Sequence, residues 1–323
     1  MKNAKHAIVF LTILAAFLAA CSPPAAPTSA FTPAAAQPSQ TATATEQPPV
    51  PLTDGLGTEV TLSAPAERIV ALGPSNTEIL FAIGAQDLIV GADQSSTYPE
   101  AAKSLATISA GYGTLDVESI TALEPDLVLA AEIISAEQVQ AMRALGLTVF
   151  YVANPQSLPD GLYANIRAIG ELTGRRAGAE DLTASLRTRF DAVAGQVAGA
   201  AEKPLVFFEL DATDPARPYT AGPGTFIDML ITLAGGRNLG ASLSSGWAQI
   251  SAEEIFRQDP DIILLGDTAF GATPEAVAGR PGWGNLAAVK TGKVFPIDSD
   301  LVLRPGPRLI DGLETMVALF HPE

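Results

Sequence analysis

The chain has 323 residues, 19 lysines and arginines against 35 aspartates and glutamates, and a formal net charge of −16. At roughly 100–200 residues per domain this length predicts two domains, and a hydrophobic fraction of 47% supplies enough apolar side chains for packed cores. The acidic balance argues against nucleic acid as a partner, because such proteins place basic side chains against phosphates. It also argues against direct adhesion to anionic lipid.

Cysteine and histidine are scarce in this chain. The single cysteine excludes a disulfide framework and a cysteine-rich metal site. His6 lies in a segment that we expect to be removed, and His321 lies two residues from the end of the sequence. A His-ligated zinc site and a Ser-His-Asp triad are therefore not expected. Most familiar hydrolase chemistry is therefore excluded, and we expect neither enzyme activity nor a resident cofactor.

The first 21 residues have the three parts of an export signal. Two lysines give a positive start, an apolar run extends from Ala7 to Ala19, and Leu18-Ala-Ala-Cys21 ends it. The run is shorter than the about 20 residues of a membrane-spanning helix, so residues 1–20 are predicted to be a signal peptide. The final tetrapeptide resembles a bacterial lipobox, which makes Cys21 the predicted lipid attachment site. An ordinary signal peptide that contains a cysteine is the alternative.

Residues 21–57 are rich in Pro, Ala, Thr, Ser and Gln. Only one charged residue, Glu46, occurs between Cys21 and Pro51, and no apolar periodicity is visible. This composition cannot bury a core and predicts a disordered, semi-extended linker. The expected arrangement is an exported, extracytoplasmic body tethered to the cell membrane by a lipid.

Seven short apolar runs follow, most of them rich in Val, Ile and Leu and bounded by Gly, Pro or Asp: 68–72, 88–92, 126–130, 147–152, 204–210, 261–265 and 293–297. They are typical of buried parallel strands in βαβ units, and amphipathic stretches lie between them. We therefore predict an α/β fold with two similar lobes, at residues 58–157 and 202–323, each with a central parallel-rich sheet.

An internal repeat supports the similarity of the lobes. The segment from Glu118 to Leu129 aligns without gaps with the segment from Glu253 to Leu264, at an offset of 135 residues. Each copy reads as a helix, an acidic-Pro-Asp break and a buried strand.

A connecting segment at 158–201 joins the two lobes. Within it, residues 175–198 carry apolar side chains on one face and Arg, Asp and Gln on the other, with no proline. About 24 residues at about 1.5 Å each give a helix of roughly 36 Å, long enough to cross the width of a lobe. A single long α-helix is therefore predicted between the lobes.

Four blocks carry a family resemblance, in this order along residues 66–320: RIVALGPSNTEILFAIGA from Arg68, EPDLVLA from Glu124, RPGWGNLAAVK from Arg280 and RPGPRL from Arg304. The chain resembles the helical-backbone substrate-binding proteins of ABC importers, whose members bind cobalamin, iron-siderophores or haem. The resemblance implies two lobes bridged by one α-helix and a ligand cleft between them. It also implies docking of a monomeric binding protein on a permease dimer with its ATPase.

Ser75-Asn76-Thr77-Glu78 follows a predicted strand and opens a predicted helix with capping-box spacing. In that arrangement Ser75 caps the backbone donors and Glu78 reaches back. Ligands also bind beyond the carboxyl ends of parallel strands, so a ligand contact from Ser75 or Asn76 is the alternative.

Glu118 and Glu253 occupy matching places in the repeat, each two residues after a predicted N-cap. The helix dipole alone favours an acidic residue there. In cobalamin-type members of the resembled family, one Glu on each lobe at this position pairs with permease arginines. Because a two-fold permease needs equivalent charges on both lobes, we predict that these two residues dock the permease.

Asp300, Arg304 and Arg308 lie in a proline-broken loop after the last predicted strand. Arginine offers a planar fork to a carboxylate, a phosphate or an amide edge. In cobalamin-type relatives the positions that match Asp300 and Arg304 contact the ligand. Arg308 is either a further ligand contact or a support for the loop.

Three aromatic residues are candidate ligand contacts. Trp247 lies where relatives place a cleft aromatic, and Tyr219 precedes a Gly-Pro-Gly loop. Tyr112 is flanked by glycines; it stacks on the ligand or, if the ligand is haem, coordinates its iron. Trp283, by contrast, is predicted to be a structural anchor.

The predicted function is to capture a metal chelate, either cobalamin or a ferric siderophore, and to deliver it to the permease. The sequence has no phosphate-binding Gly-rich motif, no nucleophile motif and no metal-ligand His spacing, which suits a chelate whose metal is already held.

Cobalamin binders often carry an aromatic residue before a Tyr-Pro pair, where this chain has only polar residues from Asp93 to Thr97. A haem receptor with Tyr112 as axial ligand and a ligand sensor are the alternatives. An exported carbohydrate-active enzyme is disfavoured, since no carboxylate pair is marked by spacing.

Overall fold

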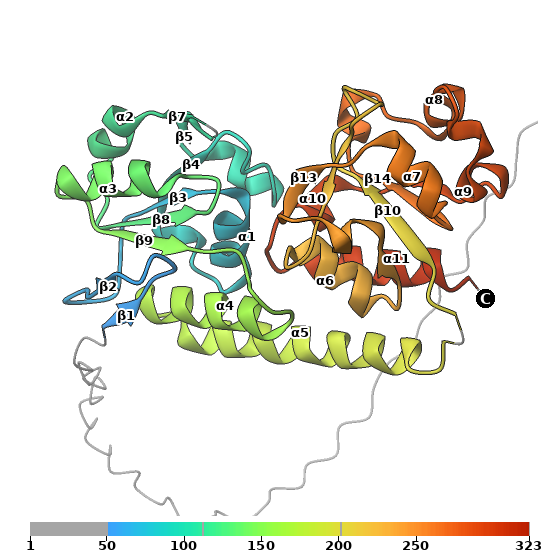
Figure 1. Ribbon diagram of the computed structural model, residues 1–323. Coiled ribbons are helices and arrows are strands. Elements are labelled where there is room, and N and C mark those ends of the chain that lie inside the picture. The colour runs from blue at the N-terminus through green and yellow to red at the C-terminus, as the bar shows by residue number, and fades with distance from the viewer. Residues whose placement is uncertain (1–50, 112, 201, 323) are drawn as a thin grey trace, which may run out of the picture. The chain divides into compact units, whose positions relative to one another are not determined.

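The computed structural model describes residues 51–111, 113–200 and 202–322, which form two α/β lobes joined by a long helix (Figure 1). The predicted signal peptide, Cys21, most of the predicted linker and Tyr112 lie outside the described residues. Among the described residues, none of the helices combines the length and the apolar composition needed to cross a bilayer.

The N-terminal lobe is built on a five-stranded parallel sheet. Its strands, in spatial order, are β5 (Thr107–Ile108), β4 (Ile89–Asp93), β3 (Ile69–Leu72), β8 (Leu127–Ala131) and β9 (Val149–Val152). Every residue of β3 and β8 is buried, as expected for strands covered on both faces. The helices of this lobe are α1 (Pro74–Ala82), α2 (Val117–Ala122), α3 (Ala136–Ala144) and α4 (Asp160–Leu172).

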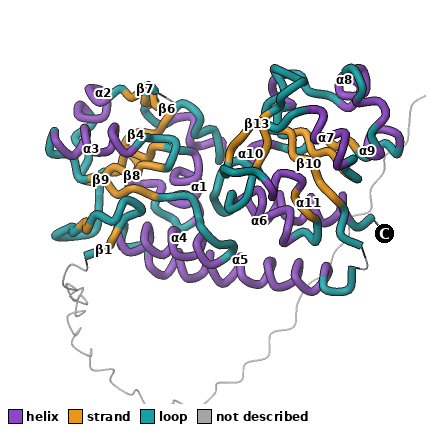
Figure 2. Tube along the Cα trace, viewed as in Figure 1, coloured by secondary structure: helices purple, strands orange, loops and turns teal. Residues whose placement is uncertain are grey.

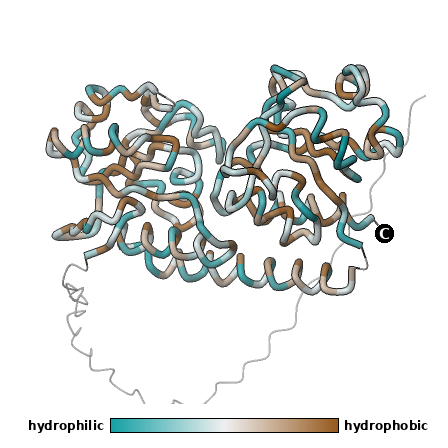
Figure 3. The backbone as a smooth tube through the Cα atoms, in the orientation of Figure 1, coloured by the Kyte–Doolittle hydropathy of each residue, from teal (hydrophilic) through white to brown (hydrophobic). Residues whose placement is uncertain are grey.

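The C-terminal lobe repeats this plan with a four-stranded parallel sheet. Its strands, in spatial order, are β12 (Arg237–Asn238), β10 (Leu205–Glu209), β14 (Ile262–Leu265) and β15 (Val294–Pro296). Its helices are α6 (Phe226–Leu233), α7 (Ala252–Gln258), α8 (Pro274–Gly279), α9 (Ala287–Lys290), α10 (Ser299–Val302) and α11 (Leu309–Phe320). In both lobes the strands lie inside and the helices outside (Figure 2), and the strands carry the most hydrophobic segments (Figure 3).

Three short antiparallel pairs complete the described strands. They are β1 (Leu52–Thr53) with β2 (Glu59–Val60), β6 (Ala110–Gly111) with β7 (Thr114–Leu115), and β11 (Tyr219–Ala221) with β13 (Trp247–Gln249). The third pair projects a short ribbon from the C-terminal lobe beside its parallel sheet.

Helix α5 (Arg176–Val197) connects the lobes and runs along the lower side of both in Figure 1. Its 22 residues span roughly 33 Å. In its C-terminal half, Arg189 donates to Asp311 and Glu314 of α11. One hydrophobic cluster contains Ile79 of the first lobe, Phe190 of α5 and Phe226 of the second lobe. The two lobes therefore share a core through this helix.

The predicted α/β class, the two similar lobes, the seven parallel strands and the long helix are confirmed. Each strand lies within two residues of its predicted ends.

The predicted linker is wrong for its last residues, 52–57, which are ordered in this structure. Asp54 is buried there, and its carboxylate accepts hydrogen bonds from the amides of Leu56 and Thr58, each at 2.9 Å, and from Arg143. Composition alone predicted disorder. In the structure, the hydrogen bonds of the Asp54 carboxylate order this turn and attach it to the lobe through Arg143.

Candidate functional site

A cleft of about 590 Å³ lies at the carboxyl ends of both parallel sheets. Its walls come from both lobes. The N-terminal lobe contributes Gly73, Pro74, Ser75, Ser95, Ala131, Glu132, Ile133 and Asn154, and the C-terminal lobe contributes Leu210, Phe226, Trp247, Ser299, Asp300, Leu303, Arg304 and Pro305. This position, beyond the carboxyl ends of parallel strands, is the usual place for a ligand in α/β folds.

Ser75 reaches the cleft because strand β3 runs almost directly into helix α1. Gly73 links them at a φ of 105°, and a Cβ there would lie 2.4 Å from the Cβ of Ala131, so only glycine fits. Pro74 then supplies the first helical residue. The capping-box prediction is wrong, because Gly73 is the N-cap, no side chain caps the helix, and Ser75 lies inside it.

Asn76 does not line the cleft. Its side chain is fully buried, and its Nδ2 donates to the carbonyl of Leu72 at 3.1 Å. The helical turn that points Ser75 towards the cleft points Asn76 into the protein, so the prediction of a ligand contact at Asn76 is corrected.

Arg304 and Asp300 lie together in the wall of the cleft. Arg304 Nη2 is 2.7 Å from Asp300 Oδ1, and Arg304 Nη1 is 3.7 Å from Glu78 Oε1. The Arg304 side chain is 15% exposed, and its Nη1 has no hydrogen-bond partner among the described residues. A buried guanidinium donor without an acceptor is costly, and a carboxylate oxygen of Glu78 lies close to this one.

Arg308 supports the loop and does not line the cleft. Its Nε and Nη2 donate to the two carboxylate oxygens of Glu78 at 3.0 and 2.6 Å. Its guanidinium also lies 4.0 Å from the ring centroid of Tyr98. Of the two roles that the sequence left open for Arg308, the structure favours support, and its inclusion among ligand contacts is corrected.

Glu78 is buried beneath these two arginines. Burial raises its pKa above the ordinary 4.5, while the hydrogen bond and charge of Arg308 and the charge of Arg304 act in the opposite direction. The Glu78 carboxylate therefore contacts the two arginines and is shielded from water.

The aromatic wall is formed by Trp247 and Phe226, both of which line the cleft. Trp247 is 41% exposed and packs against Phe226. Tyr219 is 43% exposed on the neighbouring strand but does not line the cleft, because its register pairs it with Gln249 at the far end of the ribbon. Trp283 is buried among Phe207 and Phe256, as expected for a structural anchor.

Several cleft residues escaped the sequence analysis. Glu132 directly follows β8, Asn154 is the second residue after β9, and Glu132 accepts a hydrogen bond from the amide of Asn154 at 2.8 Å. Phe226 and Ser299 each begin a helix of the other lobe. The rule that ligands lie beyond the carboxyl ends of strands would have selected the first pair.

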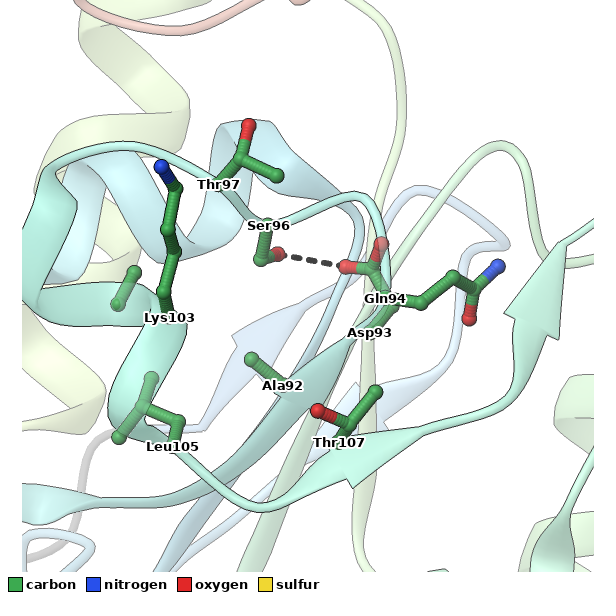
Figure 4. Close-up of a pocket in the computed structure, with 9 residues that line it drawn as sticks. Ala92, Asp93, Gln94, Ser96, Thr97, Lys103, Leu105 and Thr107 are labelled. Atoms are coloured by element: carbon green, nitrogen blue, oxygen red, sulfur yellow. Dashed lines mark hydrogen bonds between the residues drawn. The ribbon is translucent and has the colours of Figure 1, made fainter.

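A smaller polar pocket of about 150 Å³ lies beside the cleft, under the loop that follows β4 (Figure 4). The carboxylate of Asp93 accepts from the amides of Gly73 and Ser95, each at 2.8 Å, and from Ser96 Oγ at 2.7 Å. Its acceptor capacity is largely used by this loop. Asp93 therefore orders the turn that brings Ser95 to the cleft.

Glu118 and Glu253 are both exposed, and each is the second residue of its helix. The predicted N-caps are confirmed: Asp116 accepts from the amide of Ser119 at 3.0 Å, and Ser251 accepts from the amide of Glu254 at 3.2 Å. The repeat thus presents one carboxylate on each lobe in the same local geometry. No group of three or more His, Cys, Asp or Glu side chains within the described part of the chain is arranged to hold a metal ion.

The chain is similar to known proteins over most of its length. A family model described as periplasmic binding protein matches residues 69–301. The chain is 34% identical to an uncharacterized ABC transporter substrate-binding lipoprotein, YvrC, of Bacillus subtilis, over 86% of this chain and 88% of that protein. It is 35% identical to a cobalamin-binding protein of Halobacterium salinarum, over 84% of this chain and 74% of that protein.

Solved structures share the fold as well. The periplasmic heme-binding protein RhuT from Roseiflexus sp. RS-1, in its apo form, superposes with a TM-score of 0.70 at 30% sequence identity. The match covers 79% of this chain and 98% of RhuT. Sequence and structure therefore agree on two-lobed binding proteins as the relatives of this chain.

Proposed function

The chain belongs to the periplasmic binding protein family, and we propose that it captures a cobalamin-type metal chelate in its cleft and delivers it to an ABC permease dimer. The observation that carries the proposal is the cleft itself, which both lobes line at the carboxyl ends of their sheets. The cobalamin-binding relative from Halobacterium salinarum supports the choice of ligand.

The lining suits a large ligand with an apolar body and a polar edge. Trp247, supported by the buried Phe226, offers an aromatic surface for the body of the chelate. Arg304 offers guanidinium donors to an amide or phosphate group, and Asp300 and Ser75 offer acceptors or a hydroxyl nearby. The metal needs no ligand from these residues, because it arrives within its own chelate.

Delivery is assigned to Glu118 and Glu253. Both carboxylates are exposed, one on each lobe, and each lies in the first turn of a helix whose N-cap is satisfied without it. They are therefore available to arginines of a two-fold permease. Attachment of a lipid at Cys21 completes the proposal, since it keeps the extracytoplasmic body near the permease.

Haem is the second candidate, because a heme-binding protein shares the fold at 30% identity. In that case Tyr112, which lies outside the described residues, is the proposed axial ligand. A haem complex has an absorbance signature that a cobalamin complex lacks, which separates the two candidates.

The test is isothermal titration calorimetry of the full chain with cyanocobalamin, hemin and ferrichrome. We expect saturable one-to-one binding of cyanocobalamin and weaker or no binding of the other two. Saturable hemin binding with a Soret band that disappears in Tyr112→Phe would replace cobalamin by haem. Binding of none of the three would overturn the proposal.

A further inference from the structure

The two lobes meet at a second place besides helix α5, through the side chains of Glu78, Arg304 and Arg308, which we name the inter-lobe clasp. Glu78 lies on α1 of the N-terminal lobe, and the two arginines lie between α10 and α11 of the C-terminal lobe. Arg308 holds both oxygens of Glu78 across 230 residues of sequence.

The backbone around the clasp is closely packed. A Cβ on Gly306 would lie 3.4 Å from the Cα of Ser75 and 3.5 Å from Glu78 Oε2. The loop that carries the arginines therefore lies directly on the first turns of α1. The ring of Tyr98, from the loop that follows β4 in the N-terminal lobe, stacks against the Arg308 guanidinium, 4.0 Å from the ring centroid.

The clasp is continuous with the cleft. Arg304 is the member that lines it, and its guanidinium lies between Asp300 and Glu78. Ser75, one turn before Glu78 on α1, lines the same wall. A shift of Glu78 would therefore be felt by both a C-terminal and an N-terminal cleft residue.

Stability alone does not account for a carboxylate at this depth. Glu78 is 3% exposed, and burial is the largest influence on its pKa and raises it. The cost of removing charges from water offsets much of the attraction in buried ion pairs, whereas their geometry is specific. Bidentate arginine–carboxylate contacts fix orientation as well as distance.

We propose that Glu78 is a positioning residue: through the inter-lobe clasp it orients Arg304 towards the ligand and sets the separation of the lobes along that wall of the cleft. The part that concerns ligand orientation rests on the proposed function. The part that concerns the lobes does not, and it is tested without a ligand.

The first experiment is amide hydrogen exchange of the full chain without ligand, for Glu78→Gln and for the matched control Glu209→Gln. Glu209 is also buried and is held by both donors of one arginine, Arg280, but within the C-terminal lobe. For Glu78→Gln we expect about tenfold faster exchange in residues 299–308 and 74–82, because the equilibrium constant for local opening of these segments should rise by about tenfold. Glu209→Gln should leave residues 74–82 unchanged.

A second variant guards against a folding defect. Arg308→Lys keeps the positive charge but cannot bridge both carboxylate oxygens, so we expect the same segments to exchange faster, by a smaller factor. Unchanged exchange of residues 299–308 in both variants overturns the role in lobe separation.

The second experiment is a double-mutant cycle on the dissociation constant of cyanocobalamin, with Glu78→Gln and Arg304→Ala. We expect Glu78→Gln to weaken binding about tenfold alone and to have almost no further effect when Arg304 is absent, since coupled residues are not additive. Additive losses would show a general structural role and overturn the positioning role. If the unaltered chain binds no cyanocobalamin, the proposed function fails while the exchange experiment still decides the clasp.

Discussion

Trp247 and Phe226 pack edge to face in the C-terminal wall of the cleft, with ring centroids 5.7 Å apart and ring planes at 63°. Phe226 is buried, whereas 41% of Trp247 stays exposed. The inner ring thus fixes the outer one and leaves its surface free for a ligand.

Trp247→Ala is expected to raise the dissociation constant of cyanocobalamin by about tenfold to a hundredfold, or about 1.4–2.8 kcal/mol, because truncating a large aromatic anchor of a binding site has a cost of this order. Calorimetry measures the change. Trp283→Phe is the control, since Trp283 is buried in the core of the C-terminal lobe away from the cleft. It should lower the free energy of unfolding and leave the dissociation constant unaltered. Equal affinities for Trp247→Ala and the unaltered chain would remove Trp247 from the site.

Replacing Glu118 and Glu253 together by Ala is expected to reduce chelate uptake strongly and to leave the dissociation constant unchanged. The reason is that both carboxylates lie on exposed helical ends outside the cleft lining. Uptake of labelled cobalamin by whole cells measures the first effect, and calorimetry measures the second.

Glu137 and Glu275 provide a matched control for that experiment. Each is exposed and is the second residue of a helix with a capped N-terminus, one on each lobe, but neither lies in the repeat. The double change to Ala at these positions should leave uptake normal. An equal loss of uptake in both double variants would point to a general effect of surface charge and contradict specific docking.

Asp54→Ala is expected to lower the free energy of unfolding by about 3–5 kcal/mol, as measured by urea denaturation, because it leaves Arg143 partly buried without its counter-charge. The carboxylate also accepts from three backbone amides, of Leu56, Thr58 and Tyr151. The control is Asp87→Ala, which breaks an exposed pair with Arg175 and should cost about 1 kcal/mol or less. Similar small losses for both variants would contradict the account given of residues 52–57.

The two buried glutamates, Glu78 and Glu209, should make the free energy of unfolding depend on pH. Burial raises the pKa of Glu78 and of Glu209 above 4.5, against the opposing effect of their arginines. Between 4.5 and these raised values the folded chain binds more protons than the unfolded chain, so their contribution to stability is fully present below 4.5 and is lost as the pH rises through the folded pKa.

A Glu78→Gln/Glu209→Gln chain lacks this proton uptake. The free energy of unfolding of the unaltered chain, minus that of the double variant, should therefore increase when urea denaturation is repeated from about pH 7 down to about pH 5. A difference that stays constant or decreases would mean that the two groups together take up no protons on folding, and would contradict raised pKa values for both.

The strands and the long helix were predictable because their signals are local. Continuous apolar runs mark the strands, and an uninterrupted amphipathic pattern marks α5. Strands β11 and β13 have three residues each, too few to show a period, so the ribbon that carries Trp247 left no pattern in the sequence. The turn at Asp54 was missed for a related reason, since it is held by one side chain and not by composition.

The candidate site was predictable only where a local motif coincided with the fold. Ser75, Trp247, Asp300 and Arg304 were selected and do line the cleft. The spacing of Ser75 and Glu78 also suggested a capping box, but Glu78 is recruited by an arginine 230 residues away. No local sequence pattern reveals that partner. The burial of Asn76 and the pairing of Tyr219 with Gln249 likewise depend on the tertiary fold and could not be predicted from the local sequence.

Helix α5 and the core that it shares with both lobes also bear on the proposed docking to a permease. Glu118 and Glu253 lie on opposite lobes. Because α5 is continuous and shares a core with both lobes, it limits changes in the distance between these two residues. Association then freezes few internal motions, so little conformational entropy is lost when both carboxylates bind at once. If Glu118 and Glu253 dock as proposed, the two contacts form a preorganised bivalent pair, with a high effective concentration for the second contact. A permease whose arginines are spaced differently could not contact Glu118 and Glu253 at the same time and would bind more weakly.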